Sequence, residues 1–385
     1  MLAVLEPSEA IQLAIDAYQF KDASMSELSR LDLTLPKSFT VGVGMTGASG
    51  LGFGTLSGFG FVANGGEQRK KEAIVAIRGT DGAADWLTDA IIGLGVPGPT
   101  GTMVHTGFNR TWRTLQAQVD RALPPASLAG MTVHCVGHSL GGALASLAAD
   151  HLKRGGATTV KLYTFGSPRV GMIDFTKSLT HRVTADNIFR VYHPADPVPM
   201  VPVFPFTHLP AGRNGYALKC EANDRIRISA HYKMESYKTL VGKMTYDAMR
   251  NNGAQTLTDR QIEAWVRRVR AGGWVQNYGA RTMEMIGVAL DWVLRKILEG
   301  AMIGLQPYLA AGVGLLDALA YVLSMGVTLV KDVSWYVEGI MMAILKFIGR
   351  TVAKGVPLTL QFIRWALERM LREISAMARA AIGQN

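Results

Sequence analysis

The stretch VHCVGHSLGGALASLAADHL, residues Val133–Leu152, decides the fold. Strand-forming residues give way at Leu140 to small and aliphatic residues that favour a helix. Ser139 stands at the change, inside a G-x-S-x-G pattern that runs from Gly137 to Gly141. A serine in such a strand-to-helix turn takes a strained backbone conformation, and the flanking glycines remove the side chains that would clash with it. The stretch therefore predicts a strand, a sharp turn that presents Ser139, and a helix packed on a sheet.

Apolar runs on both sides of this stretch predict the rest of the sheet. Each run is apolar on both alternating faces, as in strands covered by helices on each side of a sheet. Helix-compatible segments, Asn109–Arg121 and Leu140–Arg154, lie between them, and the Gly-rich segment Phe39–Asn64 suits twisted strands. The runs are Glu72–Gly79, Met131–Gly137, Val160–Gly166 and Asn187–His193. Their alternation with helices predicts a mostly parallel α/β sheet.

The composition of the chain limits the classes of binding partner and the cellular compartment that we expect for the protein. Forty Lys and Arg against 30 Asp and Glu give a net charge of +10, which favours an anionic partner such as nucleic acid or a lipid surface. Neither a zinc-finger pattern nor an RNP motif is present, so nucleic acid is not expected. Cys135 and Cys220 cannot form a disulfide framework. The N-terminal segment MLAVLEPSEAIQLAIDAYQF has no basic start and carries acidic residues, which argues against a signal peptide.

A change of composition near residue 250 predicts two domains. Residues 1–250 mix strand, turn and helix patterns, whereas residues 251–385 contain long apolar helical runs, with Tyr246–Gln261 as the linker. Tyr308–Val330 has 23 residues with Asp317 as the only charge, enough to cross a hydrocarbon core of about 30 Å. A carboxylate at that depth is costly, so Asp317 favours a packed or reversibly inserting hairpin over a permanent anchor.

The remaining helical segments of this region suit a membrane surface or a packed bundle. Met283–Leu298 and Val333–Ile348 are shorter apolar runs that bear charges, and Leu358–Ile382 places apolar residues at helical spacing. From Arg350 to the end there are six basic and two acidic residues. Because basic amphipathic helices bind anionic lipid surfaces, we expect this region to contact a membrane.

A serine needs a base and an acid to become a nucleophile, and in sheets of this type the acid precedes the histidine in the chain. Asp196 lies in YHPADPVPMVP, directly after an apolar strand, on the sheet edge where the predicted serine turn lies. Asp186 and Asp224 are weaker alternatives because neither directly follows a strong strand. Asp196 is therefore the predicted acid.

Five histidines follow Ser139, and position along the chain separates them. Those at 151 and 181 fall on or near helices without an evident partner, and the one at 193 precedes Asp196 and suits packing at a strand end. Two remain, His208 and His231. His231 follows the short strand-like segment RIRIS and begins a helix-compatible segment, so we favour it as the base while His208 stays an alternative.

Six blocks in a fixed order resemble the class 3 lipase family, which includes fungal triacylglycerol lipases and related bacterial and plant lipid hydrolases. One block alone would say little, but their shared order is specific, and the resemblance covers roughly residues 8–245. The blocks are VAIRGTDGAADWLTD (75–89), VHTGF (104–108), VGHSLGGALASLAA (136–149), TFGSPRVG (164–171), HPADPVPMVP (193–202) and HYKMESY (231–237).

The resemblance implies an α/β-hydrolase with Ser139 as nucleophile, Asp196 as acid and His231 as base. It also implies that Thr80 and the backbone N–H of Leu140 form an oxyanion hole, and that Asp85–Gly101 acts as a lid. Neither a metal nor a cofactor is expected, since the sequence has no evident cluster of metal ligands.

These features together predict a hydrolase of lipid carboxyl esters that works at a membrane surface. The basic charge and the apolar C-terminal region favour phospholipids over neutral fat. An antibacterial effector, exported by a contact-dependent secretion machine and held by an immunity or chaperone protein, would explain a lipase without a signal peptide. Two alternatives stay open: a membrane-inserting or pore-forming protein that uses the lipase fold as a binding module, and a triacylglycerol lipase that acts on stored lipid.

Overall fold

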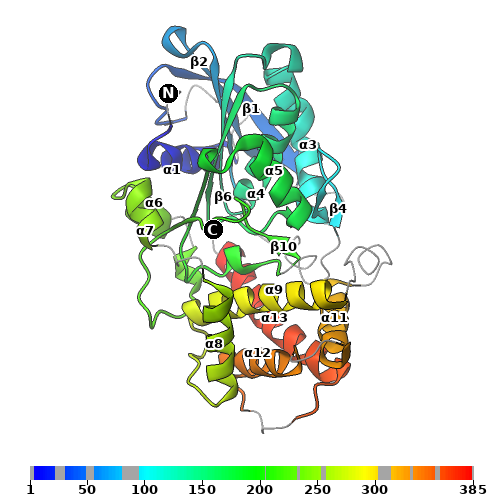
Figure 1. The fold of residues 1–385 in the computed structure, drawn as a ribbon. Coiled ribbons are helices and arrows are strands. Elements are labelled where there is room, and N and C mark those ends of the chain that lie inside the picture. Colours follow the sequence, from blue (N-terminus) through cyan, green and yellow to red (C-terminus); the bar gives the residue numbers. More distant parts are fainter. Residues whose placement is uncertain are drawn as a thin grey trace.

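The fold is built on a seven-stranded sheet with the strand order β1-β2-β3-β6-β7-β9-β11 (Figure 1). The structure is a computed structural model that describes residues 4–21, 31–48, 56–79, 95–203, 205–231, 235–252, 257–301, 314–329, 333–351 and 356–383. The strands are β1 (Phe39–Ala48), β2 (Leu56–Gly65), β3 (Glu72–Ile77), β6 (Thr132–His138), β7 (Thr159–Phe165), β9 (Ile188–Tyr192) and β11 (Tyr216–Ala217). All neighbours from β3 to β11 pair in parallel, and β1-β2-β3 pair antiparallel. The predicted mostly parallel sheet is confirmed.

Helices cover both faces of this sheet, as its apolar strands require. Ile74 and Ala76 of β3 face a core shared with α1 (Pro7–Asp16), α6 (Glu235–Val241) and α7 (Tyr246–Asn252). Val75 and Ile77 face the core beneath α3 (Thr106–Ala122), α4 (Leu140–Arg154) and α5 (Ile173–Val183). A second, small sheet pairs β10 (Phe206–Thr207), β8 (Gly171–Met172), β5 (Met103–His105) and β4 (Gly95–Pro97) in that order.

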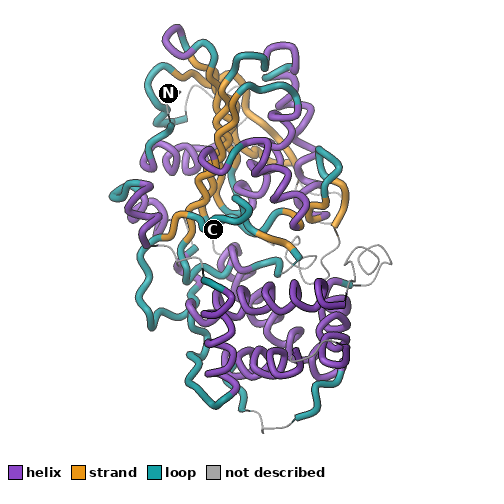
Figure 2. Tube along the Cα trace, in the orientation of Figure 1, coloured by secondary structure: helices purple, strands orange, loops and turns teal. Residues whose placement is uncertain are grey.

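The C-terminal region is helical, as predicted, and gathers in one group beside the sheet (Figure 2). It contains α8 (Asp259–Arg270), α9 (Ala280–Ala301), α11 (Leu315–Leu329), α12 (Val333–Phe347) and α13 (Leu360–Gly383). Thr258 begins α8 with a capping box, in which its side chain and Gln261 each bond the other's backbone N–H. Helix α12 packs on α8 and α9, and α11 packs on α13.

The helical region is not a separate appendage, because its core continues into the α/β part. One buried cluster contains Val104 and Leu144 of the α/β part together with Ile286 and Ile374 of the helices. Helix α13 also contacts the turns Val198–Met200 and Ile228–Ala230. Residue 250 lies inside α7, so the predicted linker is partly helical, and the division into domains 1–250 and 251–385 stays a prediction.

The long apolar run 308–330 ends in a packed helix. Residues 302–313 lie outside the described part of the chain, and from Leu315 onward α11 packs against α9, α12 and α13. Asp317 forms an ion pair with Arg364 of α13. Within the described residues, no helix combines the length and the apolar character needed to cross a membrane.

Two local expectations were wrong. The strand-like segment RIRIS forms no strand, because Arg227 N–H donates to the Ala195 carbonyl and residues Ile228–Ala230 make a 3-10 turn. His151 does have a partner, since its Nε2 lies 2.6 Å from Oδ1 of Asp120 on α3. Both contacts join residues far apart in sequence, so no local pattern could indicate them.

Candidate active site

Ser139 lies in a sharp turn between β6 and α4, as predicted. Its backbone has φ 55° and ψ −129°, a conformation that side-chain-bearing residues rarely adopt. The turn is possible because β6 and α4 approach almost to contact: a Cβ added to Gly137 would lie 2.1 Å from the Gly141 carbonyl oxygen. A Cβ on Gly141 would lie 2.1 Å from the carbonyl oxygen of Ile77 on β3. Glycine is therefore required at both positions.

Ser139, His231 and Asp196 meet in one hydrogen-bonded chain. Nε2 of His231 lies 2.9 Å from the Ser139 hydroxyl, and its Nδ1 lies 2.8 Å from Oδ2 of Asp196. All three residues are fully buried. The three come from separate places: the turn after β6, the loop after β9, and the end of the 3-10 turn Ile228–Ala230. In such an arrangement an imidazole can accept a hydroxyl proton while the carboxylate stabilises the resulting cation.

Three hydrogen-bond donors fix the carboxylate of Asp196. The backbone N–H of Val198 donates to Oδ1 at 2.9 Å, and the hydroxyl of Tyr237 donates to Oδ2 at 2.6 Å. If His231 carries its proton on Nδ1, as this geometry requires, Oδ2 also accepts from His231. The carboxylate is thus buried, but both of its oxygens accept hydrogen bonds. A protein interior tolerates a charged group only under this condition.

Sequence reasoning missed three side chains around the Ser139–His231–Asp196 chain: Tyr237, His138 and Tyr18. The ring of His138 stacks on that of His231 with centroids 4.6 Å apart, and its Nδ1 lies 2.8 Å from the Tyr18 hydroxyl. Burial, aided by the nearby imidazole of His231, holds the pKa of His138 well below its ordinary value. His138 is therefore a neutral ring packed against His231. The position of Tyr237 inside the block HYKMESY was the only available signal.

Of the two predicted oxyanion-hole residues, the structure describes Leu140 but not Thr80. Leu140 is the first residue of α4, where backbone N–H groups have no acceptor within the helix. Thr80 lies outside the described residues, as do residues 85–94 of the predicted lid; Gly95–Pro97 of that segment form β4. The chain just before Thr80 does reach the serine, since a Cβ on Gly79 would lie 2.9 Å from Cβ of Ser139.

The alternative acids and bases lie elsewhere. Asp186 pairs with Arg213 at 2.5 Å, and Asp224 accepts from the backbone N–H of Glu221. His193 packs at the end of β9, where its Nδ1 accepts from Ala195 N–H at 3.0 Å. His208 lines a cavity with two arginines and does not contact Ser139. Across the described ranges, His, Cys, Asp and Glu side chains form no group able to hold a metal ion.

Ser139 and Asp196 lie in a part of the chain that matches a known family, whereas His231 lies outside that part. Residues 74–206 match the sequence model of the family described as Lipase (class 3). Secreted mono- and diacylglycerol lipase 1 of Fusarium solani is 38% identical over 161 residues, 40% of this chain and 47% of that protein.

Two further relatives are more distant. Secreted mono- and diacylglycerol lipase A of Penicillium cyclopium is 29% identical over 195 residues, 50% of this chain and 61% of that protein. Phospholipase A(1) DAD1, chloroplastic, of Arabidopsis thaliana is 29% identical over 182 residues, 42% of this chain and 38% of that protein. The chain thus spans about two-fifths to three-fifths of the length of these three relatives.

Proposed function

We propose that this chain is a serine hydrolase of lipid carboxyl esters, from the premise that its residues 74–206 match the model of the class 3 lipase family. The observation that carries the proposal is the buried chain Ser139–His231–Asp196, with contacts of 2.9 and 2.8 Å. The relatives support an activity on lipid esters, because their names describe acylglycerol lipases and a phospholipase. The architecture is that of an α/β-hydrolase.

The proposed reaction has two halves. In the first, Oγ of Ser139 attacks the ester carbonyl while Nε2 of His231 takes its proton, and Asp196 holds the imidazolium that forms. His231 then gives this proton to the leaving alcohol, and the acyl group stays on Ser139. In the second half, His231 takes a proton from water as the water attacks the acyl group. His231 then returns this proton to Oγ of Ser139 as the bond from Oγ to the acyl carbon breaks and the fatty acid leaves.

The tetrahedral intermediate in each half carries a negative oxygen that needs fixed donors. We assign this role to the N–H of Leu140 and to Thr80, whose neighbour Gly79 packs against Ser139. The N-terminus of α4 adds the positive end of a helix dipole beside Ser139. Losing one such donor typically slows acyl transfer about a hundredfold or more.

We place the enzyme at an anionic lipid surface because the first turns of α13, together with Arg350, present apolar and basic side chains. This interfacial patch consists of Leu360, Phe362, Trp365, Arg369 and Arg350. Leu360 and Trp365 are more than two-fifths exposed, the rings of Phe362 and Trp365 stack, and the Arg350 guanidinium lies 5.6 Å from the Trp365 ring centre. Exposed aromatic and aliphatic groups next to arginines suit the boundary between lipid head groups and chains.

The first test is fatty-acid release by the full-length chain and its Ser139→Ala variant. Substrates are anionic phospholipid vesicles, mixed mono- and diacylglycerols, and triacylglycerol emulsion. We expect release from vesicles that is lost in Ser139→Ala. Release from emulsion alone would assign the chain to neutral acylglycerols, and serine-independent or absent release from all three substrates would contradict the proposal. Truncation after residue 250 is unsuitable, because it would expose the core shared with α9 and α13.

We further propose that the enzyme acts as an antibacterial effector. If the enzyme attacks bacterial phospholipids, its production in the periplasm of a sensitive bacterium should stop growth. Growth unchanged by the native chain would reject that role. Toxicity that survives Ser139→Ala would instead favour membrane insertion or pore formation.

A further inference from the structure

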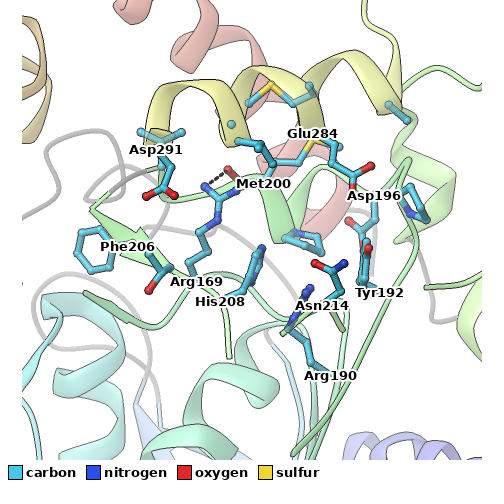
Figure 3. Close-up of a pocket in the computed structure, with 18 of the residues that line it drawn as sticks. Arg169, Arg190, Tyr192, Asp196, Met200, Phe206, His208, Asn214, Glu284 and Asp291 are labelled. Carbon is cyan, nitrogen blue, oxygen red and sulfur yellow. Dashed lines mark hydrogen bonds between the residues drawn. The ribbon is translucent and has the colours of Figure 1, made fainter. Parts of the chain in front are cut away.

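A cavity of about 280 Å³ lies between α9 and the loops that follow β9 (Figure 3). Its lining includes Asp196 but neither Ser139 nor His231. One wall comes from the α/β part, with Arg169, Arg190 and His208, and the other comes from α9. The volume is just below the range of about 300–1,000 Å³ that is usual for small-molecule sites. The cavity is therefore a compartment beside the candidate active site and distinct from the serine itself.

Two arginines, the buried Arg190 and the partly buried Arg169, reach this cavity without an ion-pair partner. Nε of Arg190 donates to the Leu209 carbonyl at 2.8 Å, and Nη1 of Arg169 donates to the carbonyls of Met200 and Pro202 at 3.2 and 2.8 Å. Among the described residues, no carboxylate forms an ion pair with either arginine. Each guanidinium carries five N–H donors, so most of its hydrogen-bonding capacity is left over. An unpaired buried charge is costly, and an anion in the cavity would relieve that cost.

The two carboxylates on the α9 wall do not supply this anion. Glu284 and Asp291 are two helical turns apart and line the cavity opposite the arginines (Figure 3). Each already pairs with an arginine of its own helix: Glu284 with Arg281 at 2.9 Å, and Asp291 with Arg295 at 2.6 Å. Both carboxylates are thus already paired on α9, and both lie beyond ion-pair distance of Arg169 and Arg190.

His208 adds a neutral polar ring between the two arginines (Figure 3). Burial, together with the charges of Arg190 and Arg169, holds the pKa of His208 well below its ordinary value. Burial and the charge of Arg190 also lower the pKa of Arg169 to about 10, which still leaves Arg169 protonated at neutral pH. The α/β wall of the cavity thus carries Arg169, Arg190 and the uncharged ring of His208. The same wall also includes Asp196 and Arg213, which already bond His231 and Asp186, respectively.

Apolar side chains make up much of the remaining lining, alongside polar residues such as Thr207 and Asn214. Met200, Val203 and Phe206 contribute from the loops, and Met283, Val288 and Leu290 from α9. A second, very small void of about 10 Å³ adjoins the cavity, since Val203 and Leu290 line both. The side chains around this void come from α9, α11 and α13 and are all apolar. Cations beside apolar walls fit an amphiphile with an anionic head and a short chain.

We propose that this cavity binds a fatty-acid carboxylate, with Arg169 and Arg190 as its charge partners. We choose a carboxylate as the ligand because the proposed reaction releases a fatty acid at Ser139, so this choice rests on the proposed function. The inference that the cavity binds an oxyanion rests on the residues of the cavity alone. Guanidinium groups pair with carboxylates through two parallel hydrogen bonds, which gives the site geometric selectivity. Because Tyr192, Asp196 and Met200 belong to the same wall, an occupant contacts the loop that holds the catalytic carboxylate.

Isothermal titration calorimetry on full-length Ser139→Ala tests the proposal without turnover. The probes are decanoate below its micelle concentration, decanol, and inorganic phosphate. We expect saturable decanoate binding, with decanol at least about tenfold weaker because it lacks the charged hydrogen bonds. Arg169→Gln and Arg190→Gln should each weaken decanoate by about tenfold or more. Arg267→Gln, an exposed arginine on α8, should leave the affinity unchanged.

A second variant guards against misfolding of the arginine variants. Asp291→Asn keeps the shape of the side chain and removes a negative charge from the opposite wall, so it should strengthen decanoate binding. Absence of decanoate binding, or weaker binding in Asp291→Asn, would overturn the proposal. If phosphate binds in an arginine-dependent way and decanoate does not bind, the proposal of a fatty-acid carboxylate is overturned and the site is assigned to a phosphate. Failure of the hydrolytic function is a separate result, because it shows only in fatty-acid release by the native chain.

Discussion

The hydroxyl of Tyr237 donates to Oδ2 of Asp196 across 2.6 Å, on the same oxygen that faces Nδ1 of His231. Tyr237 is fully buried, and its hydroxyl oxygen also accepts the backbone N–H of His193 at 3.1 Å. The hydroxyl is therefore held from two sides, and it in turn restricts the carboxylate to one orientation. We infer that Tyr237 is a positioning residue, which acts on catalysis through Asp196.

Tyr237→Phe should lower kcat by about tenfold and leave KM nearly unchanged, because it removes one hydrogen bond from a buried carboxylate. Tyr246→Phe is the matched control, since the buried Tyr246 hydroxyl has no hydrogen-bond partner in the described part of the chain. Steady-state kinetics on a soluble ester gives both constants. An equal loss of kcat in the two variants would mean that the effect comes from packing and would contradict a role through Asp196.

The same tyrosine makes a prediction about alkaline pH. Burial and the neighbouring Asp196 carboxylate raise the pKa of Tyr237 well above its ordinary value. The hydroxyl therefore stays protonated and keeps donating at pH 10. The pH profile of kcat from 8 to 10 should have the same shape in the native chain and in Tyr237→Phe. A decline near pH 10 that disappears in Tyr237→Phe would show that the tyrosine ionises there.

Gly141→Ala should prevent the fold from forming a normal turn at Ser139. The added Cβ would meet the carbonyl oxygen of Ile77 at 2.1 Å, and a backbone atom in the middle of a sheet cannot move aside. We expect a loss of about 3 kcal/mol or more in the free energy of unfolding, at the upper end for overpacked sites. Gly383→Ala is the control, because a Cβ there would have no heavy atom within 4 Å. Thermal unfolding of both variants decides the point.

Acid should destabilise the protein through buried histidines. Burial lowers the pKa of His134, His138, His193 and His208 below the ordinary value. Below about pH 6.5 the unfolded chain binds protons at these positions and the folded chain does not, so the free energy of unfolding falls as pH falls. Each histidine adds a slope of at most about 1.4 kcal/mol per pH unit.

Urea unfolding between pH 7.5 and 5 measures this slope. His208→Gln should make the slope shallower, because it removes one of the four groups. His181→Gln, which removes an exposed histidine, should leave the slope as it is in the native chain. Stability that is constant or rises on acidification would show that these rings are protonated in the fold.

Local sequence patterns sufficed for the central strands, the Ser139 turn and the helices of the C-terminal region. These elements depend on the period of apolar residues and on glycines at fixed offsets, both of which are visible in a short window. The position of Asp196 could be expected for a similar reason, because it follows β9, whose end the sequence marks. His231 was predicted partly from the strand-like segment RIRIS, which forms no strand, and its position in the block HYKMESY was the better signal. The structure brings these two residues to Ser139.

The contacts that sequence reasoning missed join residues far apart in the chain. Tyr237 bonds a residue 41 positions away, and an aromatic residue in a helix-compatible segment predicts burial without naming a partner. The pattern of α13 likewise predicts an apolar face but not that this face covers the turns Val198–Met200 and Ile228–Ala230. The cavity with Arg169 and Arg190 exists only because α9 packs there, so no single segment could indicate it.

The interfacial patch on α13 gives the last prediction. Trp365→Ala should weaken binding of the Ser139→Ala chain to anionic phospholipid vesicles by about five- to tenfold, because a partly exposed indole gains roughly 1–1.5 kcal/mol on entering the lipid boundary. Arg369→Gln should weaken binding at low salt and have less effect at high salt, since surface charges are screened. Trp274→Ala is the matched control: this residue is 80% exposed but belongs to the loop after α8. Vesicle co-sedimentation measures all three variants. If Trp365→Ala binds like the native chain, or if Trp274→Ala loses as much affinity, then α13 is not the membrane-binding face.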